Sequence, residues 1–275
     1  MALRIKFWGV RGSIACPSAD YVRYGGNTSC IEVSTESNRF ILDAGTGIRQ
    51  LGQAFIRDGV RDIDLLLTHT HWDHINGFPF FGLAYDPTRA IRVRAGHLIK
   101  SGSTIRNVLA AQMDSPMFPV PLEAMRAKIS FEDFHAGDTF DLYSGVKVKT
   151  RPLNHPNGAT GYRIEHGGRV AVYITDTEHV PGKDDANVLE LIAGADLVIY
   201  DCTYTEAEFP NRIGWGHSTW NEGMRLCRMA GVKKLAIFHH DPDHDDEFMD
   251  KLGEEAARAW NGTFVSREGM EIVLD

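Results

Sequence analysis

The segment Thr68-His-Thr-His-Trp-Asp-His74 restricts what this chain can fold into more than any other feature. Three histidines and an aspartate fall within seven residues, directly after a mostly apolar run typical of a buried strand. Because alternate side chains of an extended turn point the same way, His69 and His71 can bind one metal ion, while Asp73 and His74, beyond the bend, face a second. Imidazole and carboxylate ligands suit Zn²⁺, and a catalytic site keeps one position open for water. The alternative is a polar helix cap at Asp73.

Further polar residues stand in the same kind of place, at the carboxyl end of an apolar run. They are His155 after residues 146–153, Asp176 after residues 170–174 and His239 after residues 235–238. Loops that leave neighbouring strands at the same edge of a sheet lie close together. The sequence therefore predicts that these residues join the histidine segment in one metal centre.

Short runs of strand-like composition recur along the chain, and many end at Gly, Asn or Asp. The expected strands are residues 4–10, 30–34, 39–43, 62–68, 91–95, 146–153, 161–165, 169–175, 196–200, 234–238 and 263–265. The expected helices are residues 48–57, 104–113, 188–193, 219–230 and 247–260. Ser218 precedes one of these helices, and acidic residues begin the last. Hairpins early in the chain, with helices scattered between strands, predict an α/β fold in which two mixed β-sheets stack face to face with helices outside, an αββα sandwich.

The overall composition predicts one globular domain, residues 1–275, because 43% hydrophobic and 24% charged residues are enough for a core. A net charge of −8 argues against a broad basic surface for extended nucleic acid. The four cysteines form no Cys-x-x-Cys pair, which argues against a zinc finger or a disulfide framework. The chain shows no signal peptide and no apolar run near the roughly 20 residues that span a bilayer, so we expect a cytoplasmic protein without membrane contact.

The histidine segment resembles the HxHxDH motif of the metallo-β-lactamase superfamily. Ile41-Leu-Asp-Ala-Gly-Thr-Gly47 is similar to the aspartate-bearing turn that precedes this motif, and Ile174-Thr-Asp-Thr177 is similar to the turn with the family's bridging aspartate. The resemblance extends from about Phe7 to Val273. It implies the metallo-β-lactamase fold and a metal-dependent hydrolase.

The resemblance also implies two Zn²⁺ ions per chain, one bound by His69, His71 and His155, the other by Asp73, His74 and His239, with Asp176 bridging both. Asp43 would orient the metal-binding turn by hydrogen bonds, or else cap its own turn. His240 and His244 follow His239 closely, and their part in the site stays open. So does the native metal, because a His/Asp site also accepts Mn²⁺ and Fe²⁺.

The segment Gly214-Trp-Gly-His-Ser-Thr219 favours phosphodiester cleavage, since it resembles the His-Ser-Thr motif of the ribonuclease Z branch. There, the histidine stands over the scissile phosphate, so the resemblance implies that His217 stabilises the transition state and protonates the leaving oxygen. Asp201 would pair with His217. Otherwise His217 is a histidine at a helix start and Asp201 an aspartate in a surface turn. Leu153-Asn-His-Pro-Asn-Gly158 is similar to a further motif of the same branch.

Two glycine-rich segments, Phe7-Trp-Gly-Val-Arg-Gly-Ser13 and Gly25-Gly-Asn-Thr-Ser29, resemble a phosphodiesterase-like bacterial subgroup for which cyclic-nucleotide hydrolysis has been proposed. The planar guanidinium of Arg11 suits a phosphate of the substrate, although both segments also fit plain hairpin structure.

Together these resemblances imply a phosphodiesterase with Asp73, His217 and Asp201 as catalytic residues. A hydroxide held by two zinc ions would hydrolyse a small phosphodiester, such as a cyclic nucleotide. A tRNA 3′-processing endonuclease is less favoured, because only residues 156–175 separate His155 from Asp176, which leaves no room for a long tRNA-binding arm. The same metal ligands would also suit a thioester or lactam hydrolase, or a non-catalytic metal-bound sensor. A homodimer stays open.

Overall fold

The central strands of this protein are apolar on both faces because each lies between two layers. β4 (Asp62–Leu67) and β11 (Leu197–Asp201) are buried along nearly their whole length, as expected for strands covered on both sides. β8 (Val146–Leu153) instead alternates buried residues with exposed or half-buried ones over most of its length. The structure, a computed structural model, describes residues 2–275.

Within residues 2–275, fourteen strands form two seven-stranded sheets. The first sheet has the order β14 (Glu271–Leu274), β1 (Leu3–Gly9), β2 (Cys30–Ser34), β3 (Arg39–Leu42), β4, β5 (Ala90–Ala95) and β6 (Lys128–Asp133). The second has the order β13 (Thr263–Val265), β12 (Leu235–Phe238), β11, β10 (Arg169–Ile174), β9 (Ala159–His166), β8 and β7 (Thr139–Tyr143). Each sheet is antiparallel on one side and parallel on the other, so both are mixed.

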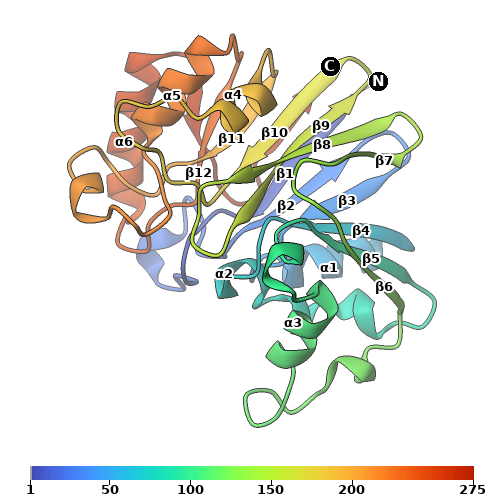
Figure 1. The fold of residues 1–275 in the computed structure, drawn as a ribbon. Helices are drawn as coiled ribbons and strands as arrows, with labels where there is room; N and C mark the ends of the chain where they lie inside the picture. Colours follow the sequence, from blue (N-terminus) through green and yellow to red (C-terminus); the bar gives the residue numbers. More distant parts are fainter. Residues whose placement is uncertain (1) are drawn as a thin grey trace.

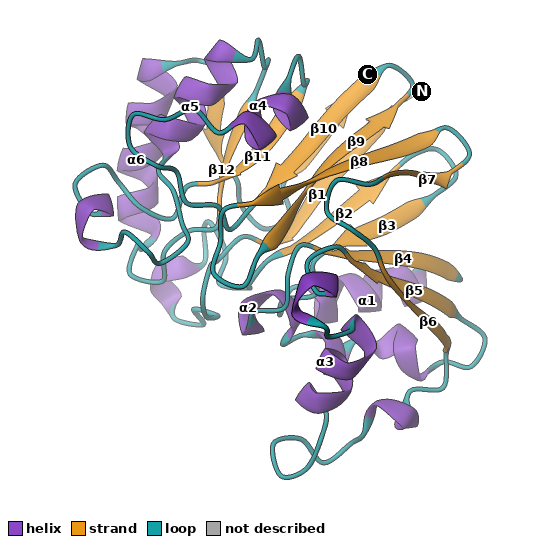
Figure 2. Ribbon diagram, in the orientation of Figure 1, coloured by secondary structure: helices purple, strands orange, loops and turns teal. Residues whose placement is uncertain are grey.

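The helices cover the outer faces of the two sheets. They are α1 (Ile48–Arg57), α2 (Trp72–Ile75), α3 (Ile105–Gln112), α4 (Ala186–Ile192), α5 (Trp220–Met229) and α6 (Asp246–Ala259). Figure 1 shows α4, α5 and α6 beside β10, β11 and β12, and α1 and α3 beside β4, β5 and β6. Figure 2 shows the strands forming the inner layers. The predicted αββα sandwich is therefore confirmed.

Three apolar clusters correspond to the three interfaces between these four layers. Residues of β1, β3, β8, β9 and β10 fill the space between the sheets, for example Phe7, Phe40 and Tyr162. A second cluster joins the first sheet to α1 and α3, and a third joins the second sheet to α4, α5 and α6. No helix among the described residues is long and apolar enough to cross a membrane.

The expected helices and strands occur within about two residues of their predicted bounds. The last helix starts at the expected acidic residues, whereas the helix expected to start at Ser218 is capped by the next residue, Thr219. The side chain of Thr219 accepts a hydrogen bond from Glu222 N, and that of Asp245 accepts one from Phe248 N. The strands β6, β7 and β14 were not predicted.

One hydrogen bond joins the two sheets at the end of β4. The hydroxyl of Tyr162 on β9 donates to Leu67 O at 2.6 Å, and both groups are buried. Because Leu67 immediately precedes the histidine segment, this bond helps to fix where that segment begins.

We predict that Tyr162→Phe lowers the free energy of unfolding by about 1–3 kcal/mol, since it leaves a buried carbonyl without a donor. Urea unfolding followed by circular dichroism measures the change. Tyr85→Phe is the matched control: its hydroxyl donates to Pro79 O at 2.8 Å, but the side chain is only partly buried, so water replaces the bond. Equal losses in the two variants would contradict the prediction.

Candidate metal centre

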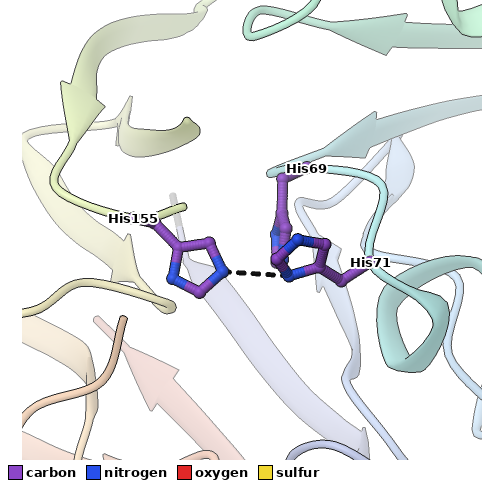
Figure 3. Close-up of side chains that lie close together, drawn as sticks. All are labelled: His69, His71 and His155. Atoms are coloured by element: carbon purple, nitrogen blue, oxygen red, sulfur yellow. Dashed lines mark hydrogen bonds between the residues drawn. The ribbon is translucent and has the colours of Figure 1, made fainter. Parts of the chain in front are cut away.

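The strand ends converge on a cluster of buried histidines and aspartates. His69 and His71 follow β4, and His155 follows β8. Figure 3 shows the three rings turned toward one another, with His71 Nδ1 3.0 Å from His155 Nε2. One ligand atom from each of the three lies within 4.8 Å of the others. This spacing suits a single metal ion.

A second group, Asp73, His74, Asp176 and His239, meets the same distance criterion. His239 Nε2 lies 3.1 Å from Asp73 Oδ2 and 3.3 Å from His74 Nε2. A carboxylate only accepts, and a ring nitrogen of neutral imidazole accepts when the other ring nitrogen carries the proton. The group therefore gathers acceptors at one point.

Hydrogen bonds at the far side of each ring decide which nitrogen faces the cluster as a lone pair. His74 Nδ1 lies 2.9 Å from Asp43 Oδ2, and since a carboxylate only accepts, Nδ1 carries the proton. Thr203 donates its hydroxyl to Asp201 Oδ1 at 2.7 Å, so its oxygen accepts from His239 Nδ1 at 3.0 Å. Both Nε2 atoms are thus free to bind a cation, as in metal sites whose ligands are oriented by outer partners.

Electrostatics also requires positive charge here. Burial opposes protonation of His74, but the carboxylates of Asp176, Asp73 and Asp43 outweigh it and hold the pKa of His74 well above its usual range. At His69, burial lowers the pKa well below its usual range, so that ring is neutral. Its Nε2 is buried without a hydrogen-bond partner. A divalent cation satisfies both demands, which a proton on His74 alone does not.

Asp176 faces both groups with different oxygen atoms. Its Oδ1 lies 3.6 Å from His69 Nε2 and 3.7 Å from His155 Nε2. Its Oδ2 lies 3.1 Å from His74 Nε2 and 3.4 Å from His239 Nε2. This is the arrangement that a carboxylate shared by two ions needs.

Strained backbone aims several of these side chains. Asp43, Asp176 and His239 adopt positive φ angles of 60°, 57° and 62°, and each follows a strand within two residues. The left-handed region costs a non-glycine residue about 1–2 kcal/mol. Such strain concentrates at functional sites, where the surrounding structure enforces it.

Asp43 is completely buried and holds the histidine segment from behind. It accepts hydrogen bonds from Thr68 N at 2.8 Å, from the hydroxyls of Thr68 and Tyr173 at 2.9 Å, and from His74 Nδ1. This geometry agrees with the orienting part expected for Asp43.

His217 lies at the edge of the cluster, paired with Asp201. Its Nδ1 is 3.0 Å from Asp201 Oδ2, and its ring stacks on that of His239 at 4.9 Å between centroids. Burial opposes the charged ring, yet the carboxylate of Asp201 raises the pKa of His217 to about 9. The protonated form therefore predominates at neutral pH.

Arg11, the expected phosphate contact, is hydrogen-bonded to backbone carbonyl groups of the protein. Its guanidinium is buried and donates to the carbonyl oxygens of Gly25, Asp241 and His244, at 2.9, 3.1 and 2.6 Å. It therefore ties the glycine-rich loops to the loop after β12. We do not include Arg11 among the residues proposed to contact substrate.

His240 and His244 lie outside the metal-binding groups found among residues 2–275. His240 Nε2 lies 2.9 Å from Ser266 O, and His244 Nε2 lies 2.9 Å from Glu208 Oε1. Of the three histidines after β12, only His239 belongs to such a group.

The backbone near Arg11 has a function that the sequence did not reveal. Ser13 N donates to Asp73 Oδ2 at 2.8 Å. A Cβ atom on Gly12 would lie 2.4 Å from the ring of His239. In the sequence, the only sign of these contacts was that Gly12 belongs to a glycine-rich segment.

Comparisons with known proteins agree on one family. A family model described as a beta-lactamase superfamily domain matches residues 38–240. A ribonuclease Z of Haloarcula marismortui is 25% identical and is aligned over 98% of this chain and 96% of its own length. Among solved structures, the metallo-beta-lactamase fold protein YhfI of Bacillus subtilis has a TM-score of 0.74 at 16% identity, with 99% of both chains covered. A diphosphatase from the PhnP family has a TM-score of 0.70 at 18% identity, covering 99% of this chain and 98% of its own.

We predict that Asp176→Asn reduces bound metal at both positions, whereas Asp73→Asn reduces it at one. The reason is that Asp176 faces both groups and Asp73 belongs to one. Plasma mass spectrometry of protein dialysed against buffered Zn²⁺ measures the stoichiometry. Asp196→Asn is the matched control. Asp196 is a mostly buried carboxylate directly before β11 and belongs to none of the candidate metal-binding groups. Unchanged metal content in Asp176→Asn would refute the assignment.

We also predict that chelation lowers the melting temperature of the wild-type protein. A cation that binds only the folded chain stabilises it by about 2.7 kcal/mol at a free concentration of 100 Kd. Differential scanning calorimetry with and without Zn²⁺ measures the shift, which should be much smaller in Asp176→Asn. Equal shifts in both proteins would indicate that zinc binds elsewhere.

Proposed function

Because this chain belongs to the beta-lactamase superfamily and is a metal-dependent hydrolase, we propose that it hydrolyses a phosphodiester. The observation that carries the proposal is the pair His217–Asp201 beside the two groups of proposed ligands. His217 also lies close enough to His155 and Asp176, and to Asp201 and His239, to form two further groups of the same kind. Relatives named as ribonucleases and a structural neighbour named as a diphosphatase also act on phosphate esters or anhydrides. The proposed metal ligands are His69, His71, His155, Asp73, His74, His239 and Asp176.

Divalent ions held by these residues, two Zn²⁺ in our proposal, would supply Lewis acidity and an activated water. The chain itself contributes the geometry. Asp201 occupies Nδ1 of His217, which leaves Nε2 of the protonated ring for the substrate. His217 can then donate a hydrogen bond to a phosphate oxygen and a proton to the leaving oxygen. Asp201 is held for this task by Thr177 N at 3.1 Å and by Thr203.

We favour a small diester, such as a cyclic nucleotide, over tRNA. β9 and β10 form a tight hairpin across Gly167 and Gly168, so no arm extends between His155 and Asp176. The net charge of −8 supports the same choice. RNA cleavage is the second candidate, because the curated ribonucleases match nearly the whole chain. We further propose that residues 1–275 act as one domain, since the two sheets share one core. We also propose that the protein acts in the cytoplasm.

We predict that the zinc-loaded protein hydrolyses bis(p-nitrophenyl) phosphate. His217→Ala should lower kcat about 10²- to 10³-fold, as expected on losing a hydrogen-bond donor to the charge that develops on the phosphate oxygens; p-nitrophenolate needs little protonation to leave. Asp73→Ala should abolish turnover together with one metal. His135→Ala, which removes an exposed histidine outside the candidate metal-binding groups, is the control. The measurement is the initial rate at 405 nm, on protein of known metal content.

Two results would contradict this proposal. Hydrolysis of a chromogenic lactam or thioester in preference to the diester would indicate another hydrolase of the same fold. Two bound metals without turnover of any ester would indicate a sensor. If the diester is cleaved, cyclic nucleotides tested beside a precursor tRNA with a 3′ trailer separate the two candidate substrates.

A further inference from the structure

Two tryptophans are largely exposed beside the metal centre. Trp72 has 79% of its surface accessible and Trp215 has 60%. Tryptophan is usually well buried, because its large apolar ring gains free energy on leaving water. Two exposed tryptophans next to candidate ligands in the sequence are therefore candidates for contact with a ligand.

Both tryptophans lie on segments that contact a single ring of the centre. His155 Nε2 lies 3.0 Å from Nδ1 of His71, the residue before Trp72. His155 Nδ1 lies 2.8 Å from the carbonyl oxygen of Gly216, the residue after Trp215. Figure 3 shows the side of the His155 ring that faces His71. The two tryptophans thus come from segments that approach this ring at its two different nitrogens.

The backbone at Trp215 is held in place. Gly214 and Gly216 both adopt φ angles of +90°, and their N–H groups donate to Glu178 Oε2 at 2.7 and 2.8 Å. A Cβ atom on Gly216 would lie 2.2 Å from the ring of His155, so only glycine fits there. The Glu178 carboxylate therefore fixes the turn that presents Trp215.

The backbone at Trp72 is equally constrained. Trp72 is the first residue of α2, and its carbonyl accepts from Asn76 N at 2.7 Å. His74 N donates to His71 O at 3.0 Å. An exposed ring on fixed backbone loses little conformational entropy when a flat partner covers it.

A positive charge accompanies one of the rings. The guanidinium carbon of Arg212 lies 4.9 Å from the ring centroid of Trp215. In a chain with a net charge of −8, an aromatic ring next to a cation suits a ligand that combines a flat base with an anionic phosphate.

We propose that Trp72 and Trp215 are specificity-determining residues that form the aromatic surface contacted by the nucleobase of the substrate. The inference rests on the proposed phosphodiesterase function and adds that the diester is a nucleotide. The two rings contact the base, while the metal centre and His217 act on the phosphorus.

The test compares two chromogenic diesters with the same leaving group, thymidine 5′-(p-nitrophenyl phosphate) and methyl p-nitrophenyl phosphate. The quantity measured is selectivity, the ratio of kcat/KM for the nucleoside ester to that for the methyl ester. Trp215→Ala and Trp72→Ala should each lower this ratio about ten-fold, within the range for loss of one base–aromatic stack. Trp215→Phe should retain most of it. Ile213→Ala, in the same loop and 58% exposed, should leave it unchanged.

The outcomes separate this inference from the proposed function. If the wild-type protein cleaves neither ester, the proposed function fails, and quenching of tryptophan fluorescence by adenosine 5′-monophosphate then tests stacking alone. Quenching in the wild-type protein that is reduced in both alanine variants supports the inference. No quenching in the wild-type protein, or equal quenching in the variants, overturns it.

If both esters are cleaved and the selectivity ratio is unchanged in the variants, the proposed phosphodiesterase function is supported and the stacking role is overturned. The same holds if both rates fall equally, since that indicates a purely structural effect. Light scattering after gel filtration completes the test. If the alanine variants differ from the wild-type protein in oligomeric state but not in selectivity, the tryptophans belong to a subunit interface and the inference is overturned.

Discussion

The convergence of buried hydrogen-bond acceptors at the ends of β4, β8, β10 and β12 is the constraint on which the site depends. Carboxylates and imidazole lone pairs repel one another away from water, so this arrangement is stable only with positive charge among them. A divalent cation bound by these groups would supply that charge and would also be the largest local charge in the site. The fold satisfies the geometric side of the requirement, because all four strands deliver their following loops to one edge of the sandwich.

The outer partners of these ligands are as specific as the ligands themselves. Asp43 binds the proton of His74, and Thr203 binds that of His239, so both rings present Nε2 inward. Asp201 serves two purposes, since it fixes Thr203 and also holds His217 protonated. The candidate metal centre and His217 are therefore connected through one buried carboxylate.

The exposed tryptophans fit the same plan. Glu178 lies two residues after Asp176 and binds the turn that carries Trp215 and His217. One short segment after β10 thus contributes both a candidate ligand and the support for the neighbouring loop. Features that look independent along the chain are joined within a few ångströms in the fold.

Much of this protein could be predicted from local pattern. The helix bounds followed from the hydrophobic period and the αββα sandwich from the order of the elements, whereas the grouping of seven candidate ligands followed from apolar runs that end in histidine or aspartate. All of these are properties of the chain alone. The strands β6, β7 and β14 escaped prediction because edge strands are partly exposed and mix charged with apolar residues. Arg11 shows the other limit: its residue type suits a phosphate, but its partners are carbonyl oxygens from residues as distant as His244. The sequence by itself determined which groups can bind metal. Only the tertiary structure decided which nitrogen faces inward, which residues support the ligands and which aromatic rings stay exposed, because those depend on contacts between segments far apart in the chain.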